Sequence, residues 1–240
     1  MLYDMQAFTA AYYGRLHEAR THAQRAVNLA RETAHDERAA LYETASALRE
    51  AFLGYRSEAR TAAATALQLS RDREVEYGVA FALALAGDVD RAQALTADLE
   101  KRFPEDTSVQ YSYLPAMRAL LALEHNEPAR AIDLLAVSAP YDFGAPRCSH
   151  HGFYGALYPV WVRGEAYLAL NKRKEAAAEF QKILDHQGVV VNDIIGALAR
   201  LRVAQATGSP ARYHDFLDLW KTADPGIPAL LDARRAANGL

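Results

Sequence analysis

Cysteine is almost absent from this chain of 240 residues, because Cys148 is its single copy. A lone cysteine forms no disulfide within the chain, so the fold does not rely on an oxidising compartment. Long apolar runs are missing as well, since no uncharged stretch approaches the roughly 18 residues that cross a bilayer. The opening residues, MLYDMQAFTAAYYG, carry no basic segment and are interrupted by Asp4, unlike a signal peptide. These absences predict a cytoplasmic protein without a membrane span.

An excess of positive charge is also missing. The formal net charge is −3, and no stripe of Lys and Arg runs along the chain. Proteins that bind nucleic acids gain most of their affinity by neutralising phosphates with basic side chains. The charge therefore predicts a partner other than nucleic acid.

The sequence motifs of common enzymes do not occur. There is no G-x-G-x-x-G loop, V-A-I-K strand or H-R-D loop, which a kinase needs together to hold ATP and metal. G-x-S-x-G, H-E-x-x-H and the P-loop are absent too. Asp142-Phe143-Gly144 spells a kinase tripeptide, but without those partners it predicts a turn after a helix that Pro140 stops. We therefore expect a protein that is not an enzyme and needs no cofactor.

A short stretch resembles the beginning of a zinc site. Cys148, His150 and His151 are three candidate ligands, whereas a structural zinc site needs about four and usually has paired spacing. His125 and His186 lie far away in the sequence. We expect this stretch to be a polar linker that binds no metal.

What the chain does contain is alanine at helical spacing and a recurring phrase. β-Branched runs are scarce, and GVVVN at 188–192 is the clearest of them. The phrase consists of a turn residue, four further residues and then alanine. It occurs as Gly14–Ala19, Gly54–Ala59, Gly87–Ala92, Asn126–Ala131 and Asn171–Ala176, and Gly208 adds one more turn residue at a similar interval.

The phrase predicts helical hairpins. Gly and Asn tolerate the left-handed backbone that ends a helix, and a small alanine lets the two helices of a hairpin cross closely. Residues 160–184 show the pattern most clearly. Gly164, Tyr167, Ala176, Phe180 and Ile183 match the G-x2-Y…A-x3-F spacing of the tetratricopeptide repeat (TPR).

The repeat predicts an all-α fold, a right-handed α-solenoid of about six TPR-like hairpins in one domain spanning 1–240. The expected hairpins are 3–34, 36–71, 73–103, 107–138, 153–186 and 191–223, followed by a capping helix at 228–237. An irregular helical bundle with alanine-rich seams is the alternative, but it needs no constant spacing from turn residue to alanine. Pentatricopeptide repeats have a similar period but bind RNA, which the charge disfavours.

The wording of the repeats resembles one family in particular. The chain is similar to the C-terminal TPR region of acidobacterial serine/threonine kinases and winged-helix regulators. The phrases that carry the resemblance are KRFPEDT (101–107), LYPVWVRGEAYLAL (157–170), AAAEFQKILDHQG (176–188), NDIIGALARL (192–201) and FLDLWKTADPGIP (216–228). The resemblance implies a scaffold or sensor segment of a bacterial signalling protein. The chain departs from the family pattern between Leu201 and Phe216, where it is several residues shorter. We therefore expect a shortened last hairpin.

Function in such a repeat lies on the concave face, which the first helix of each hairpin lines. The register places aromatic, Met and charged residues there, of the types that supply binding anchors. The candidate partner-binding residues are Tyr77, Phe81, Tyr113, Met117, Tyr158, Trp161, Glu165 and Arg202. We expect a non-catalytic module that binds a protein or a peptide, with homo-oligomerisation of a larger protein as the alternative.

One known TPR device is not expected. The clamp that grips the C-terminal carboxylate of chaperones needs Lys and Asn on its first repeats. Asp4 and Phe8 occupy the corresponding positions here. A ligand with two carboxylates at its end therefore does not fit.

Overall fold

The computed structural model describes residues 2–144 and 155–239, and their regular structure is helical. The all-α prediction is confirmed for this part of the chain. The α-helices are α1 (Leu2–Tyr12), α2 (Leu16–Glu32), α3 (Asp36–Phe52), α4 (Arg56–Leu69), α5 (Arg73–Leu85), α6 (Val89–Arg102), α7 (Leu114–Glu124), α8 (Pro128–Leu135), α9 (Tyr158–Ala169), α10 (Arg173–Asp185), α11 (Gln187–Val190), α12 (Ile194–Thr207), α13 (Pro210–Leu219) and α14 (Pro228–Ala237). A π-helix, η1 (Val109–Tyr113), precedes α7, and a 3-10 helix, η2 (Ala136–Tyr141), follows α8.

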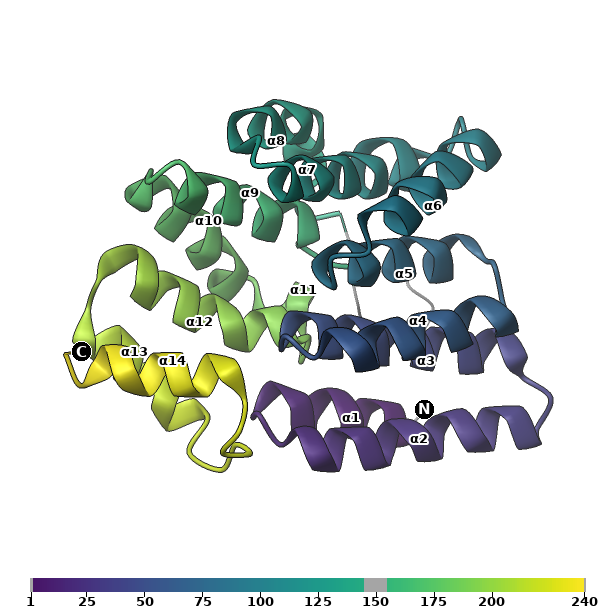
Figure 1. Cartoon of the computed structure of the whole chain (residues 1–240), viewed down its shortest axis with the longest axis horizontal. Helices are drawn as coiled ribbons and strands as arrows, with labels where there is room; N and C mark the ends of the chain where they lie inside the picture. The colour runs from purple at the N-terminus through teal and green to yellow at the C-terminus, as the bar shows by residue number, and fades with distance from the viewer. Residues whose placement is uncertain (1, 145–154, 240) are drawn as a thin grey trace.

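Helices that follow one another in the chain pack as pairs. The pairs are α1 with α2, α3 with α4, α5 with α6, α7 with α8, α9 with α10, and α12 with α13. Alternate helices also touch, because α5 lies against both α3 and α7, and α7 lies against α9. Figure 1 shows the pairs following one another along an arc, with the C-terminal helices next to α1 and α2.

The turn inside each pair has the backbone that the sequence predicts. Gly14, Gly54, Gly87, Asn126, Asn171 and Gly208 all have positive φ angles, between 56° and 88°. In five of these turns, all except that at Gly208, the following residue donates its N–H back into the first helix, for example Arg15 to the carbonyl of Ala10 at 2.9 Å. This is the bond that ends a helix on a left-handed residue, and Gly and Asn adopt that conformation at low cost.

The alanine of each phrase lies where two helices cross. Ala19, Ala59, Ala92, Ala131 and Ala176 are all at most 1% exposed. Gly164 shows how close the helices come, because a Cβ on it would stand 2.7 Å from Cζ of Phe180. These alanines are buried and Gly164 lies against Phe180, as expected if small residues let the helices cross closely.

The end of the fourth pair differs from the sequence prediction. Pro140 was expected to stop a helix, but α8 already ends at Leu135 and the chain continues through η2, which contains Pro140. Pro140 has no backbone N–H to donate within this short 3-10 helix. In the last pair, α12 has 14 residues and α13 has 10.

In the described part of the chain, no helix combines the length and the apolar character that crossing a membrane requires. The apolar residues instead form one large cluster that runs through all the helix pairs.

Candidate functional site

The helices α5, η1 and α9 bring the predicted aromatic residues together. Tyr77 and Tyr113 stack with their ring centroids 3.9 Å apart, and Phe81 lies 4.7 Å from Tyr158. Six of the candidate residues are at most 4% exposed: Tyr77, Phe81, Tyr113, Met117, Tyr158 and Trp161. In this conformation they are packed together as core and are not open to a partner. We call the five aromatic residues of this set, together with Phe52, the inner cluster.

Phe52 was not among the candidate residues. It lies at the end of α3, and its ring centroid stands 5.5 Å from Tyr158, 5.6 Å from Trp161 and 5.9 Å from Phe81. It therefore connects the second helix pair to the fifth. Phe52 lies two residues before the turn residue Gly54, so its place at the end of a helix follows from the sequence. Nothing near it in the sequence indicates a contact with α9.

The remaining two candidate residues form a partly exposed patch with Trp161. Arg202 on α12 donates from Nε to Oε1 of Glu165 on α9 at 2.7 Å. The guanidinium carbon also lies 5.7 Å from the centre of the Trp161 ring, a distance typical of a cation–π contact. The side chains of Arg202 and Glu165 remain 33% and 24% exposed. We call these three residues the Trp161 patch.

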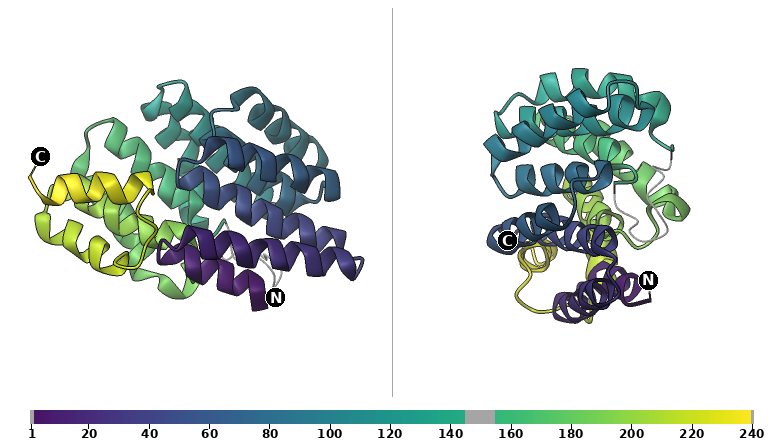
Figure 2. Two further views of the ribbon diagram at one scale, coloured as in Figure 1. Left: turned by 60° about the horizontal axis from the view of Figure 1, so that its bottom comes forward. Right: turned by 90° about the vertical axis from the view of Figure 1, so that its right-hand side faces the viewer.

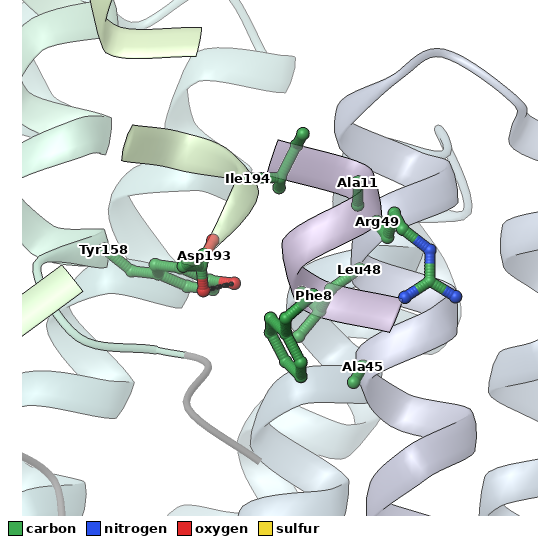
Figure 3. A pocket seen from close by; sticks show the side chains of 8 residues that line it. All are labelled: Phe8, Ala11, Ala45, Leu48, Arg49, Tyr158, Asp193 and Ile194. Carbon is green, nitrogen blue, oxygen red and sulfur yellow. Dashed lines mark hydrogen bonds between the residues drawn. The ribbon is translucent and has the colours of Figure 1, made fainter. Parts of the chain in front are cut away.

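A small cavity lies beside the inner cluster, between α1, α3, α9 and α12. Its volume is about 10 Å³, room for about one water molecule. Figure 3 shows Tyr158 and Asp193 on one side of it, and Phe8 and Leu48 on the other. Such a space is too small for a peptide side chain.

Asp193 is the buried acid of this cavity. Its carboxylate accepts hydrogen bonds from the backbone N–H of Ile195 at 3.1 Å and from the hydroxyl of Tyr158 at 3.2 Å. Burial raises the pKa of Asp193 from 3.8 to about 7, although both hydrogen bonds act in the opposite direction. Burial, followed by the neighbouring carboxylate, raises the pKa of Tyr158 well above its ordinary value.

A second buried acid, Asp4, lies on α1. Burial raises the pKa of Asp4 to about 7, and the charge of Arg49 opposes this increase. Burial lowers the pKa of Arg49, whose Nη2 donates to the hydroxyl of Ser46 at 2.9 Å. The positions where a carboxylate clamp would need Lys and Asn thus hold a buried acid, Asp4, and a cavity wall, Phe8.

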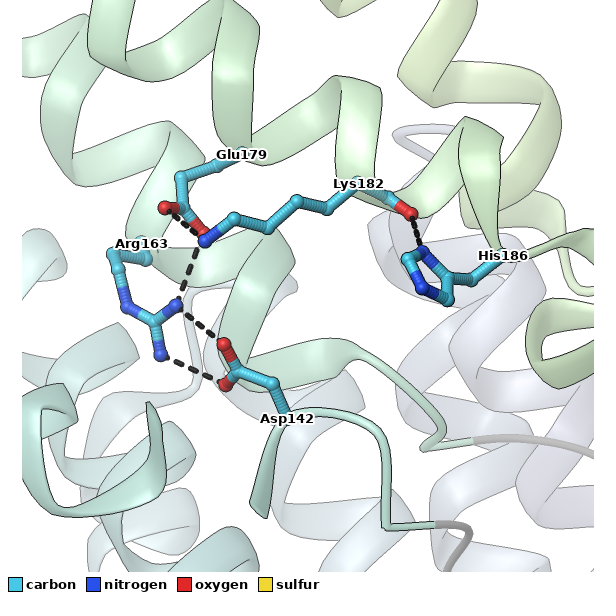
Figure 4. Close-up of polar contacts among 5 residues, drawn as sticks. All are labelled: Asp142, Arg163, Glu179, Lys182 and His186. Atoms are coloured by element: carbon cyan, nitrogen blue, oxygen red, sulfur yellow. Dashed lines mark hydrogen bonds and ion pairs between the residues drawn. The ribbon is translucent and has the colours of Figure 1, made fainter. Parts of the chain in front are cut away.

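A buried ion-pair network follows the fourth helix pair (Figure 4). Arg163 on α9 donates from both terminal nitrogens to Asp142, each at 2.9 Å, and also to Glu179 on α10 at 3.0 Å. Lys182 reaches the other oxygen of Glu179 at 2.8 Å. Burial disfavours the charge on Arg163, but the contacts with Asp142 and Glu179 together outweigh it and raise the pKa of Arg163. The polar atoms of the network contact one another, so the network is structural and links Asp142 to α9 and α10.

The tripeptide at 142–144 therefore has a role that the sequence did not reveal. Asp142 lies in a turn, as expected, and its side chain, which is 5% exposed, is also committed to Arg163. Phe143 stacks on His186 with centroids 4.1 Å apart. Sequence reasoning missed this role because Arg163 lies 21 positions away, on another helix.

The stretch proposed and rejected as a zinc site, Cys148, His150 and His151, lies outside the described residues. Across residues 2–144 and 155–239, no three His, Cys, Asp or Glu side chains gather in a way that would hold a metal ion.

Comparisons with known proteins identify no relative: no family model matches the chain, and no curated protein or solved structure matches it.

Proposed function

We propose that the chain is a non-catalytic protein-interaction module, built as a right-handed solenoid of six TPR-like hairpins with α14 as its capping helix. The support is the recurring geometry: a left-handed turn residue, a buried alanine five positions later, and contacts between successive and alternate helices. The resemblance of the sequence further suggests a scaffold or sensor segment of a bacterial signalling protein.

The observation that carries the proposal is the Trp161 patch. It joins three of the predicted binding residues on α9 and α12, and its charged members remain partly exposed. The Arg202 guanidinium is shared between Glu165 and the ring of Trp161, so it can exchange these contacts for a carboxylate or a backbone carbonyl of a partner. A peptide segment with an acidic group beside an apolar side chain fits this combination.

The test is capture of binding partners by immobilised protein, followed by quantitative mass spectrometry. We expect Arg202→Ala to reduce capture of the partner by about tenfold, since one charge-assisted contact contributes about 1.4 kcal/mol or more. We expect Glu165→Ala to leave capture equal or higher, because Glu165 competes with the partner's acidic group for Arg202. Far-UV circular dichroism checks that both variants keep their helices.

Arg130→Ala is the matched control. Arg130 pairs with Glu127 at 2.7 Å on α8, and its side chain is 68% exposed, so the variant removes an exposed ion pair elsewhere on the surface. We expect it to capture the partner as the unaltered protein does. Equal capture by all three variants contradicts the assignment of the patch, and recovery of the chain itself as the sole partner favours self-association.

A further inference from the structure

The two ends of the described chain are held together by specific hydrogen bonds. Trp220 donates from its indole nitrogen to the carbonyl of Tyr12 at 3.0 Å. Asp224 donates its backbone N–H to the carbonyl of Gly14 at 3.0 Å, and its carboxylate accepts from the N–H of His17 at 2.7 Å. These contacts join residues more than 200 positions apart, and the views of Figure 2 show the C-terminal helices beside α1 and α2.

Asp224 acts as a cap for α2 from the far end of the chain. Arg15 occupies the position before α2 where Ser, Thr, Asp or Asn usually supplies an oxygen to the first turn. The carboxylate of Asp224 provides that oxygen to His17, and a negative charge is favourable at a helix N-terminus.

Gly14 is shaped for this contact as well as for its turn. Its φ angle is +73°, and a Cβ on it would stand 2.5 Å from Cβ of Ala223 and 2.9 Å from the ring of Trp220. Gly14 is therefore required twice, by its backbone and by the close approach of the C-terminal segment. Gly208 has a similar φ angle of +64°, but among the described residues a Cβ there would meet nothing within 4 Å.

A second seam runs along α1 and α12. Asn192 donates from its side chain to the hydroxyl of Thr9 at 3.0 Å. A Cβ on Gly196 would lie 3.1 Å from the ring of Tyr12, so the two helices touch closely. Both helices form walls of the small cavity, through Phe8 and Ile194, and the opposite wall is Tyr158 of the inner cluster.

We propose that the contact of residues 9–17 with residues 192–196 and 220–224 is a latch that keeps the inner cluster closed. With the latch shut, the space beside Tyr158 holds about one water molecule. With the latch released, α1 and α12 separate, and Phe8, Tyr158 and Ile194 become the walls of an open apolar groove. This groove would adjoin the Trp161 patch and admit an apolar side chain of the partner. In this respect the latch proposal rests on the proposed function.

Gly14→Ala tests the latch, with Gly208→Ala as the matched control. Both variants place alanine in a left-handed turn, but only the first also introduces a side chain into the latch. We expect Gly14→Ala to speed amide hydrogen exchange by about tenfold or more in segments 8–14, 156–161 and 192–198. We also expect it to increase the fluorescence of the apolar dye 8-anilinonaphthalene-1-sulfonate (ANS), which reports exposed apolar surface. Gly208→Ala should change neither readout.

Asp224→Ala provides a second test, because it removes the cap on His17 without adding bulk. We expect the same segments to exchange faster, by a smaller factor, with exchange in 89–102 and 114–124 unchanged. Equal behaviour of Gly14→Ala and Gly208→Ala overturns the proposal. So does faster exchange at 8–14 and 192–198 without ANS binding or any change at 156–161. If Gly14→Ala does not fold, Asp224→Ala decides. Neither readout uses a partner, so a failed latch and a failed partner assignment are separate results.

Discussion

Gly164 shows at the scale of one residue how a repeat pattern becomes a packing constraint. It lies on α9, where three carbons of the Phe180 ring stand between 2.7 and 3.0 Å from the place of a Cβ. Alanine is a better helix former than glycine by about 1 kcal/mol, whereas overpacking a closed site costs about 1 to 3 kcal/mol. The net effect is a loss, and we predict that Gly164→Ala lowers the free energy of unfolding by up to about 2 kcal/mol, measured by urea denaturation.

The control for this prediction is Gly188→Ala in α11. Among the described residues, a Cβ on Gly188 meets nothing within 4 Å, so only the helix preference acts there. The control should be neutral or slightly stabilising. A Gly164→Ala protein as stable as its Gly188→Ala counterpart would show that Phe180 moves aside at little cost.

At the scale of the element, the start of α12 combines a helix cap with a buried titratable group. Asp193 caps this helix through Ile195, and burial raises its pKa from 3.8 to about 7. Tyr158 lies beside it on the same side of the cavity, and Arg49 lies on the opposite side (Figure 3). The acid is therefore protonated in the folded chain at pH values where the unfolded chain has lost that proton.

This difference gives a pH dependence with a definite sign. Because the folded state binds the extra proton, the contribution of Asp193 to stability is complete below pH 4, falls between pH 4 and 7, and changes no further above pH 7. We predict that Asp193→Asn removes a slope of up to about 1.4 kcal/mol per pH unit in that window, since asparagine keeps the cap without a titrating group.

Urea unfolding at pH 4.5, 5.5, 6.5 and 7.5 measures this slope in both proteins. Asp4 has its pKa raised to about 7 as well and is unaltered in both, so its contribution cancels in the comparison. If the free energy of unfolding changed with pH by the same amount in both proteins, the prediction would be contradicted.

At the scale of the whole molecule, the sequence predicted what depends on local chemistry. The left-handed turns and the buried alanines each follow from residues within a few positions of one another, and the structure has them. The burial of Asp142 against Arg163, the position of Phe52 and the cap from Asp224 to His17 depend on how the arc of helices bends. No periodic signal encodes that bend, so these contacts could not be predicted.

The same bend determines how the molecule unfolds. In an open array of repeats the terminal units contact one neighbour each and fray independently. Here Trp220, near one end, is bonded to Tyr12, near the other. The ends should therefore unfold together with the middle, in one cooperative transition.

Trp161→Phe makes this measurable, because the chain contains two tryptophans and Trp220 becomes the single fluorescent reporter of the closure. We predict that fluorescence and far-UV circular dichroism give the same urea midpoint in this variant. Adding Asp224→Ala should move the fluorescence midpoint to lower urea while the circular dichroism midpoint shifts less, because the closure then opens before the remaining helices unfold. Separate midpoints in Trp161→Phe alone would mean that the ends fray as they do in an open array, and that the contact between them contributes no cooperativity.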